Sequence, residues 1–125
     1  MIVVDASAIA AVLFNEHMGE EIERRLEGEV LVAPPLIHLE MANACLKRII
    51  RHPEARDLWF EALMTLGDWQ IALDDVDLRE TVSLAALHGL TAYDASYLWL
   101  SRELGAELVT LDAKLARAYS AMTGA

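Results

Sequence analysis

The sequence predicts an α/β fold, a three-layer α/β/α sandwich around a central, mainly parallel sheet of four or five strands. Short apolar segments that suit strands alternate along the chain with longer segments that suit helices. Parallel neighbours need crossover connections, usually helices, and these cover both faces of the sheet. The 125 residues can bury a core of their own, and no linker or repeat divides them, so we expect a single domain over residues 1–125.

The first half of the chain supplies two strands and three helices. Strands are expected at Ile2–Val4 and Val30–Val32, and helices at about Ser7–Phe14, at His17–Glu27 and from Pro34–Pro35 to about Arg51. Gly28 ends the second helix, because glycine readily adopts the left-handed turn that follows many helices. The two prolines suit a helix's first turn, where their missing N–H groups have no intrahelical partner.

The second half continues the alternation. Helices are expected at Pro53–Leu66, Val76–His88, Thr91–Leu104 and Ala113–Ala121, and strands at Trp69–Leu73 and Leu108–Leu111. Gly105 closes the third of these helices in the way that Gly28 closes an earlier one. This order of strands and helices completes the α/β prediction.

Composition narrows the possible classes of protein. The net charge of −10 argues against broad, nonspecific attraction of nucleic acid to the whole surface. The single cysteine, Cys45, excludes an intrachain disulfide and suits a reducing compartment. No basic segment precedes the first apolar residues, and no apolar run approaches the roughly 20 residues that cross a bilayer. We therefore expect a soluble, cytoplasmic protein.

Two aspartates directly follow apolar strand candidates, Asp5 in IVVD and Asp112 in LVTLD. In an open α/β sheet, ligands bind beyond the carboxyl ends of the strands, where both aspartates should lie. Each aspartate can also be explained as the N-cap of the helix that follows it. Asp94 has a structural explanation too, because it lies three residues after a capping Thr91 and can complete a capping box.

Glu40 is harder to explain by structure alone. Its neighbours three and four residues away on the helix form a mostly apolar face: Leu36, Ile37, Asn43 and Ala44. A lone carboxylate on such a face is costly to desolvate unless it is protonated or finds a positive partner. Convergence of the four acids on a divalent cation would explain all of them, because carboxylate oxygens are preferred ligands of Mg²⁺ and Mn²⁺.

The stretches VVDASAIAAVLFNE, LEMANACLKR and LTAYDASYLWLSRELGAELVTLDAKLARA resemble the PIN domain, and more narrowly the VapC-type toxins of toxin-antitoxin pairs. The resemblance implies that Asp5, Glu40, Asp94 and Asp112 form an acidic quartet that coordinates Mg²⁺ or Mn²⁺. It also implies supporting hydrogen bonds from Ser7, Asn43 and Thr110. Ser7 can instead be a plain helix cap. Family members usually carry a short strand after the last helix, whereas YSAMTGA suggests that this strand is missing or truncated.

The resemblance further implies a metal-dependent endoribonuclease that acts on structured RNA such as tRNA or rRNA. An antitoxin of the VapB type would hold it inactive, and a homodimer is expected. Alternatives are a non-toxin PIN nuclease in RNA processing, a catalytically silent PIN domain that binds a partner, and a response-regulator receiver domain. The receiver domain is disfavoured, because its phosphoacceptor candidate, Asp57, lies in a helical segment.

Basic residues near the expected site are candidates for RNA phosphate contacts: Arg48, Arg51, Lys114 and Arg117. Lys47, Arg48, Arg51 and Arg56 lie within ten residues, and either a solvated helix surface or a phosphate-binding patch explains them. Tyr93, Tyr97 and Trp99 are expected in the core or at a dimer face, with base stacking as the alternative. The four histidines show no metal-ligand spacing.

Overall fold

The central sheet has four parallel strands in the order β3-β2-β1-β4. The structure is a computed structural model, and it describes residues 1–124. The strands are β1 (Ile2–Val4), β2 (Leu31–Ala33), β3 (Ala72–Leu73) and β4 (Glu107–Val109). β1 lies between β2 and β4, with Ile2 beside Leu31 on one side and Glu107 on the other. Within the described residues no strand follows the last helix, so the sheet has the lower of the two expected strand numbers.

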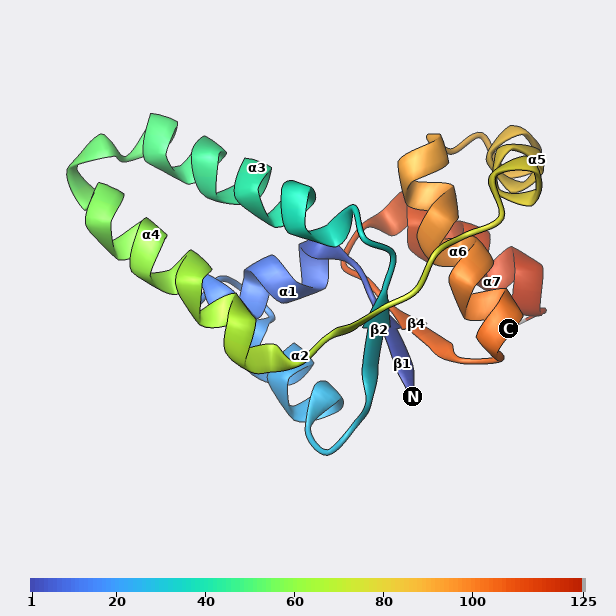
Figure 1. Cartoon of the computed structure of the whole chain (residues 1–125), viewed down its shortest axis with the longest axis horizontal. Coiled ribbons are helices and arrows are strands. Elements are labelled where there is room, and N and C mark those ends of the chain that lie inside the picture. The colour runs from blue at the N-terminus through green and yellow to red at the C-terminus, as the bar shows by residue number, and fades with distance from the viewer. Residues whose placement is uncertain (125) are drawn as a thin grey trace.

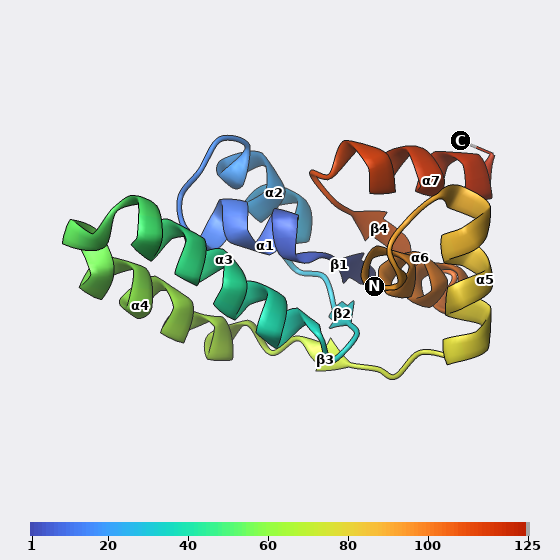
Figure 2. The ribbon, with the colours of Figure 1, turned by 90° about the horizontal axis from the view of Figure 1, so that it is seen from above.

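Helices lie on both sides of this sheet, which confirms the predicted α/β fold (Figures 1 and 2). On one side are α1 (Ala6–Leu13), α2 (Gly19–Leu26), α3 (Ile37–Arg51) and α4 (Arg56–Met64). On the other side are α5 (Leu78–His88), α6 (Ala92–Leu104) and α7 (Ala113–Thr123). The α3–α4 hairpin extends well past the strands in both views. No helix in residues 1–124 is long and apolar enough to cross a bilayer.

The core lies where β1 and β2 meet the helices. Both strands are buried along their whole length, as continuous apolar runs in parallel sheets usually are. α1 contributes small residues, and α2 packs directly against it. A Cβ atom at Gly19 would lie 2.4 Å from the Ala11 carbonyl oxygen, so only glycine permits this approach. α1, which begins beside Asp5, therefore packs closely against the start of α2.

Several expected boundaries were wrong, each for a local reason. Pro34 and Pro35 lie in a turn before α3, with Ile37 N–H donating to the Pro34 carbonyl. A residue that precedes proline is pushed out of the helical region, which prevents Pro34 from starting the helix. The expected helix over residues 53–66 is α4 flanked by two 3₁₀ turns, η1 (Pro53–Ala55) and η2 (Thr65–Trp69).

The third strand is shorter than the expected Trp69–Leu73. Trp69 belongs to η2, and Gln70 takes a left-handed conformation with φ of 53°. The backbone therefore turns before it becomes extended, and only Ala72 and Leu73 pair with β2. β3 is consequently a short edge strand, and it contributes no residue to the pocket described next.

Candidate active site

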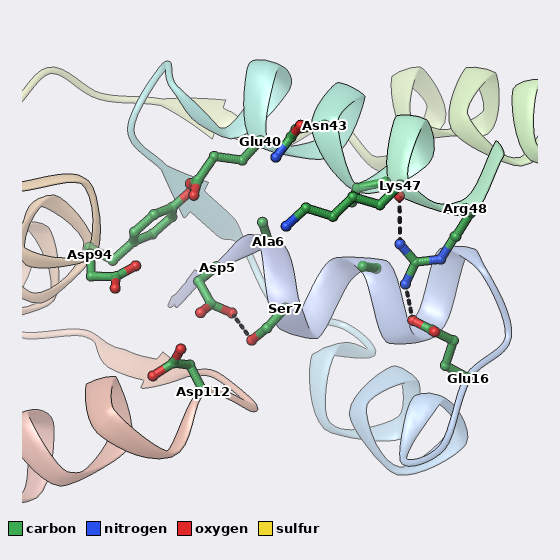
Figure 3. Close-up of a pocket in the computed structure, with 13 residues that line it drawn as sticks. Asp5, Ala6, Ser7, Glu16, Glu40, Asn43, Lys47, Arg48, Asp94 and Asp112 are labelled. Atoms are coloured by element: carbon green, nitrogen blue, oxygen red, sulfur yellow. Dashed lines mark hydrogen bonds and ion pairs between the residues drawn. The ribbon is translucent and has the colours of Figure 1, made fainter. Parts of the chain in front are cut away.

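The four acids singled out from the sequence line one pocket of about 470 Å³ (Figure 3). They come from four separate elements at the carboxyl edge of the sheet. Asp5 follows β1 and Asp112 lies three residues after β4, while Glu40 and Asp94 occupy the first turns of α3 and α6. This edge is where open α/β sheets bind their ligands.

Asp5 is buried, with 5% of its surface exposed, and it accepts three hydrogen bonds. Ala8 N–H donates to Oδ1 at 3.1 Å, which makes Asp5 the N-cap of α1. The Ser7 hydroxyl donates to the same oxygen at 2.7 Å, and the Thr110 hydroxyl donates to Oδ2 at 2.5 Å. Asp5 is therefore both a helix cap and a fixed carboxylate of the pocket, and the predicted supporting hydroxyls do contact it.

The same two hydroxyls attach the loop after β4 to the turn between β1 and α1. Leu111 N–H donates to Ser7 Oγ at 2.9 Å, and Asp112 N–H donates to Thr110 Oγ1 at 3.0 Å. Because these N–H groups bond to side chains, β4 ends at Val109 and not at the expected Leu111. The loop thereby carries Asp112 to Asp5, and Figure 3 shows the two carboxylates facing one another.

Asp112 and Asp94 occupy the helix N-termini that the sequence suggested. Asp112 Oδ1 accepts a hydrogen bond from Leu115 N–H at 2.8 Å and caps α7. Thr91 caps α6, with its hydroxyl accepting from Asp94 N–H at 3.1 Å. Capping and placement in the pocket are therefore compatible, because a cap uses only part of a carboxylate's accepting capacity.

Glu40 is half-buried and faces the pocket from α3. The Tyr97 hydroxyl on α6 donates a hydrogen bond to its Oε1. Tyr97 is 1% exposed and Trp99 is buried, which confirms a core position for both, whereas Tyr93 is 67% exposed. Sequence reasoning missed the bond between Tyr97 and Glu40, because nothing in the pattern links positions 57 residues apart.

The environment of the pocket disfavours the charged form of three of these acids. Burial is the main cause that raises the pKa of Asp5, and the nearby Asp112 raises it further, against hydrogen bonds from Thr110, Ser7 and Ala8. Burial also raises the pKa of Glu40, with added repulsion from Asp94 and Asp5 and opposition from Tyr97. For Asp94, burial and repulsion by Asp112 raise the pKa, while Thr91 and Lys114 lower it.

A hard divalent cation fits this set of donors. All four acids offer carboxylate oxygens, and a positive ion would remove the repulsion that adds to the effect of burial in raising the pKa values of Asp5, Glu40 and Asp94. Across residues 1–124, no three acids, histidines or cysteines already have the close spacing of a formed metal centre. The acids that would hold the ion are Asp5, Glu40, Asp94 and Asp112, and their role as ligands stays a prediction.

The remaining lining includes the predicted Asn43 and three charged residues, Glu16, Lys47 and Arg48. No sequence pattern points to Glu16, and the sequence places Lys47 only within the basic cluster. Arg51, Lys114 and Arg117 are exposed and do not line the pocket, although Lys114 is near enough to Asp94 to lower its pKa. The histidines do not line it either.

Sequence comparison connects this chain to a known family. The sequence profile of the PIN domain matches residues 2–121. Ribonuclease VapC3 of Pyrobaculum aerophilum is 35% identical over 132 aligned residues, covering 97% of this chain and 96% of that protein. Exonuclease VapC9 of the same organism is 33% identical over 125 residues, covering 90% and 80%.

Two solved structures resemble the fold. PAE2754 from Pyrobaculum aerophilum superposes with a TM-score of 0.75 at 30% identity, covering 94% of this chain and 84% of that one. VapC20 of Mycobacterium tuberculosis, described as a sarcin-ricin loop cleaving toxin, gives a TM-score of 0.66 at 13% identity, covering 94% and 95%. At 13% identity, the second likeness shows a common fold alone.

Proposed function

The chain belongs to the PIN-domain family, among its VapC-type ribonucleases, and from this premise we propose that it is a metal-dependent endoribonuclease. Relatives of this chain are named ribonuclease and exonuclease, so the chain is a nuclease. The observation that carries the finer proposal is the meeting of four carboxylates from four separate elements in one pocket. A donor set made only of carboxylates is typical of Mg²⁺ and Mn²⁺ sites.

The chain's own residues would hold and orient the reacting groups. Asp5 is preorganised by three hydrogen bonds, and Tyr97 fixes Glu40 on the opposite wall. Asp112 accepts a hydrogen bond from Leu115 N–H, so three of the four carboxylates are held in place before substrate arrives, and Asp94 lies in the first turn of α6. A bound divalent cation would supply an acidified water and neutralise charge on the phosphodiester.

We propose that the protein is the toxin of a toxin-antitoxin pair and that its substrate is a structured RNA such as tRNA or rRNA. The VapC names of its relatives support the pairing, because they imply a VapB-type antitoxin as partner. The antitoxin would inhibit by covering the acid pocket. A homodimer is also proposed, and the exposed apolar side chains of Leu78 and Val82, one helical turn apart on α5, support it.

The decisive experiment is cleavage of end-labelled tRNA and rRNA fragments with Mg²⁺, with Mn²⁺ and with chelator. We expect internal cuts that leave 5′-phosphates and that disappear in chelator. Asp94→Asn should abolish them, whereas the matched control Asp75→Asn, an exposed acid outside the pocket, should not. Cleavage that persists in chelator would contradict the metal-dependent mechanism. Stepwise loss from one end would indicate an exonuclease, as the name of VapC9 suggests.

Expression without the antitoxin separates a toxin from an RNA-processing nuclease. We expect growth arrest with the wild-type chain and normal growth with Asp94→Asn at equal protein levels. Harmless expression of wild-type protein that cleaves RNA after purification would favour the processing role. Wild-type protein that is folded but inactive on every RNA tested would favour a catalytically silent, partner-binding domain.

A further inference from the structure

Two cationic side chains line the pocket beside the four acids, Lys47 and Arg48, both on α3. The acids repel a phosphodiester as well as each other, and the whole chain carries a net charge of −10. A cation beside the pocket is therefore important for holding an RNA strand there. Lys47 and Arg48 differ in the contacts that they make within the protein.

Arg48 is already engaged within the protein. Its guanidinium donates to the Ala44 carbonyl at 2.7 Å and pairs with Glu16 from the turn between α1 and α2. It also lies over the Phe14 ring, 4.3 Å from the centroid, and its side chain is only 17% exposed. These contacts tie the second half of α3 to the end of α1, so Arg48 acts as a structural anchor.

Lys47 is exposed, and within residues 1–124 it has neither a hydrogen-bond nor an ion-pair partner. Figure 3 shows its side chain extending over Ala6 towards the acids. Lys47 follows Glu40 by seven residues, two helical turns, so both lie on one face of α3 about 10 Å apart along the axis. Asn43 lies between them on the same face and also lines the pocket.

We propose that Lys47 binds a phosphate of the RNA strand beside the scissile one, and that the strand runs along the pocket face of α3. This inference rests on the proposed ribonuclease function and adds the direction in which the substrate lies. A lysine ammonium binds phosphate as a compact point charge, without the fixed fork geometry of arginine. The anchoring of Arg48 holds α3 so that the neighbouring Lys47 points over the pocket.

The test compares RNA cleavage by wild-type protein, Lys47→Met, Lys47→Arg and Arg79→Met over a series of salt concentrations. Arg79→Met is the matched control, because Arg79 is an exposed helical cation outside the pocket and outside every described ion pair. We expect Lys47→Met to lower kcat/KM about tenfold, mainly through KM, and to reduce the slope of log kcat/KM against log salt by about 0.7 to 1. Lys47→Arg should restore most of the activity and the slope.

The outcomes separate this inference from the proposed function. If the wild-type protein cleaves RNA but Lys47→Met matches Arg79→Met in KM and salt slope, the inference is wrong and the ribonuclease assignment stands. A loss confined to kcat, with an unchanged salt slope, would also overturn it. If the wild-type protein cleaves no RNA, the proposed function fails and this inference fails with it.

Discussion

The Tyr97 hydroxyl on α6 donates a hydrogen bond to the Glu40 carboxylate on α3, joining two walls of the acid pocket. The tyrosine is almost fully buried, so its ring orientation is fixed by the core while its polar end reaches the site. This bond lowers the pKa of Glu40 against the effect of burial, which raises it. The core therefore helps to set the charge of the pocket.

Tyr97→Phe removes this donor and little else. We expect the pKa of Glu40 to rise further and the acidic limb of the pH–rate profile to move to higher pH. Loss of a hydrogen bond to a half-buried carboxylate should lower the free energy of unfolding by about 1 kcal/mol. Rate profiles and urea unfolding would measure the two effects. Tyr119→Phe, on α7 and outside the pocket, is the control and should change neither.

Asp112 offers a way to separate capping from the chemistry of the pocket. Asparagine caps helices as well as aspartate does, so Asp112→Asn should keep the stability of the protein while losing cleavage. Asp112→Ala should lose cleavage and also about 1 kcal/mol of unfolding free energy. Thermal unfolding beside an RNA cleavage assay would test both variants. Full activity of Asp112→Asn would show that capping is the residue's whole role.

Thr110→Val should loosen the link between the two aspartates. The hydroxyl donates to Asp5 and accepts from Asp112 N–H, so the variant leaves a buried carboxylate oxygen and a backbone donor without this partner. We expect a loss of about 1 to 3 kcal/mol in unfolding free energy and a fall in kcat. Thr110→Ser keeps the hydroxyl and should restore most of both. Equal behaviour of the two variants would contradict this role for the hydroxyl.

The raised pKa values predict how stability depends on pH without divalent metal. A carboxyl group whose pKa is raised in the folded state stabilises the protein in acid, and this contribution is lost as the pH rises through the folded pKa. Glu40→Gln removes one such group. The variant should therefore gain stability relative to wild type between about pH 5 and pH 8.

Urea unfolding at the two pH values, with and without Mg²⁺, measures this difference. Adding Mg²⁺ at the higher pH should stabilise the wild-type protein more than the variant, by about 2.7 kcal/mol for wild type when the ion is at 100 times its Kd. A stability difference that does not change with pH would show that the charge of Glu40 is not penalised in the pocket.

Local patterns in the sequence predicted the parallel sheet and the place of Asp5 and Asp112 at its carboxyl edge, whereas the meeting of all four acids was inferred from the apolar face around Glu40 and from the family resemblance. Apolar runs mark the strands, and an aspartate directly after a strand must lie at its carboxyl edge. The bond between Tyr97 and Glu40 and the pairing of Arg48 with Glu16 had no such signal. They depend on how α1, α3 and α6 pack together, and packing between elements leaves no periodic mark on the sequence.

The boundaries that were wrong also have a common physical origin. The sequence suggested that β4 runs to Leu111, but Thr110 and Ser7 offer hydrogen bonds that compete with the sheet. At Pro34, the effect of a following proline outweighed the preference of proline for a helix's first turn. In both cases a neighbouring side chain, a hydroxyl after β4 and a proline ring before α3, moved the end of the strand or the start of the helix.

The central place of β1 has a consequence for protein synthesis. Asp5 is made early, but its Thr110 donor is added 105 positions later, after the neighbouring strand β4. At translation rates of about 5 to 20 residues per second, this interval lasts about 5 to 20 s. A growing chain therefore has no complete acid pocket during that time, beside the RNA of the ribosome that is making it.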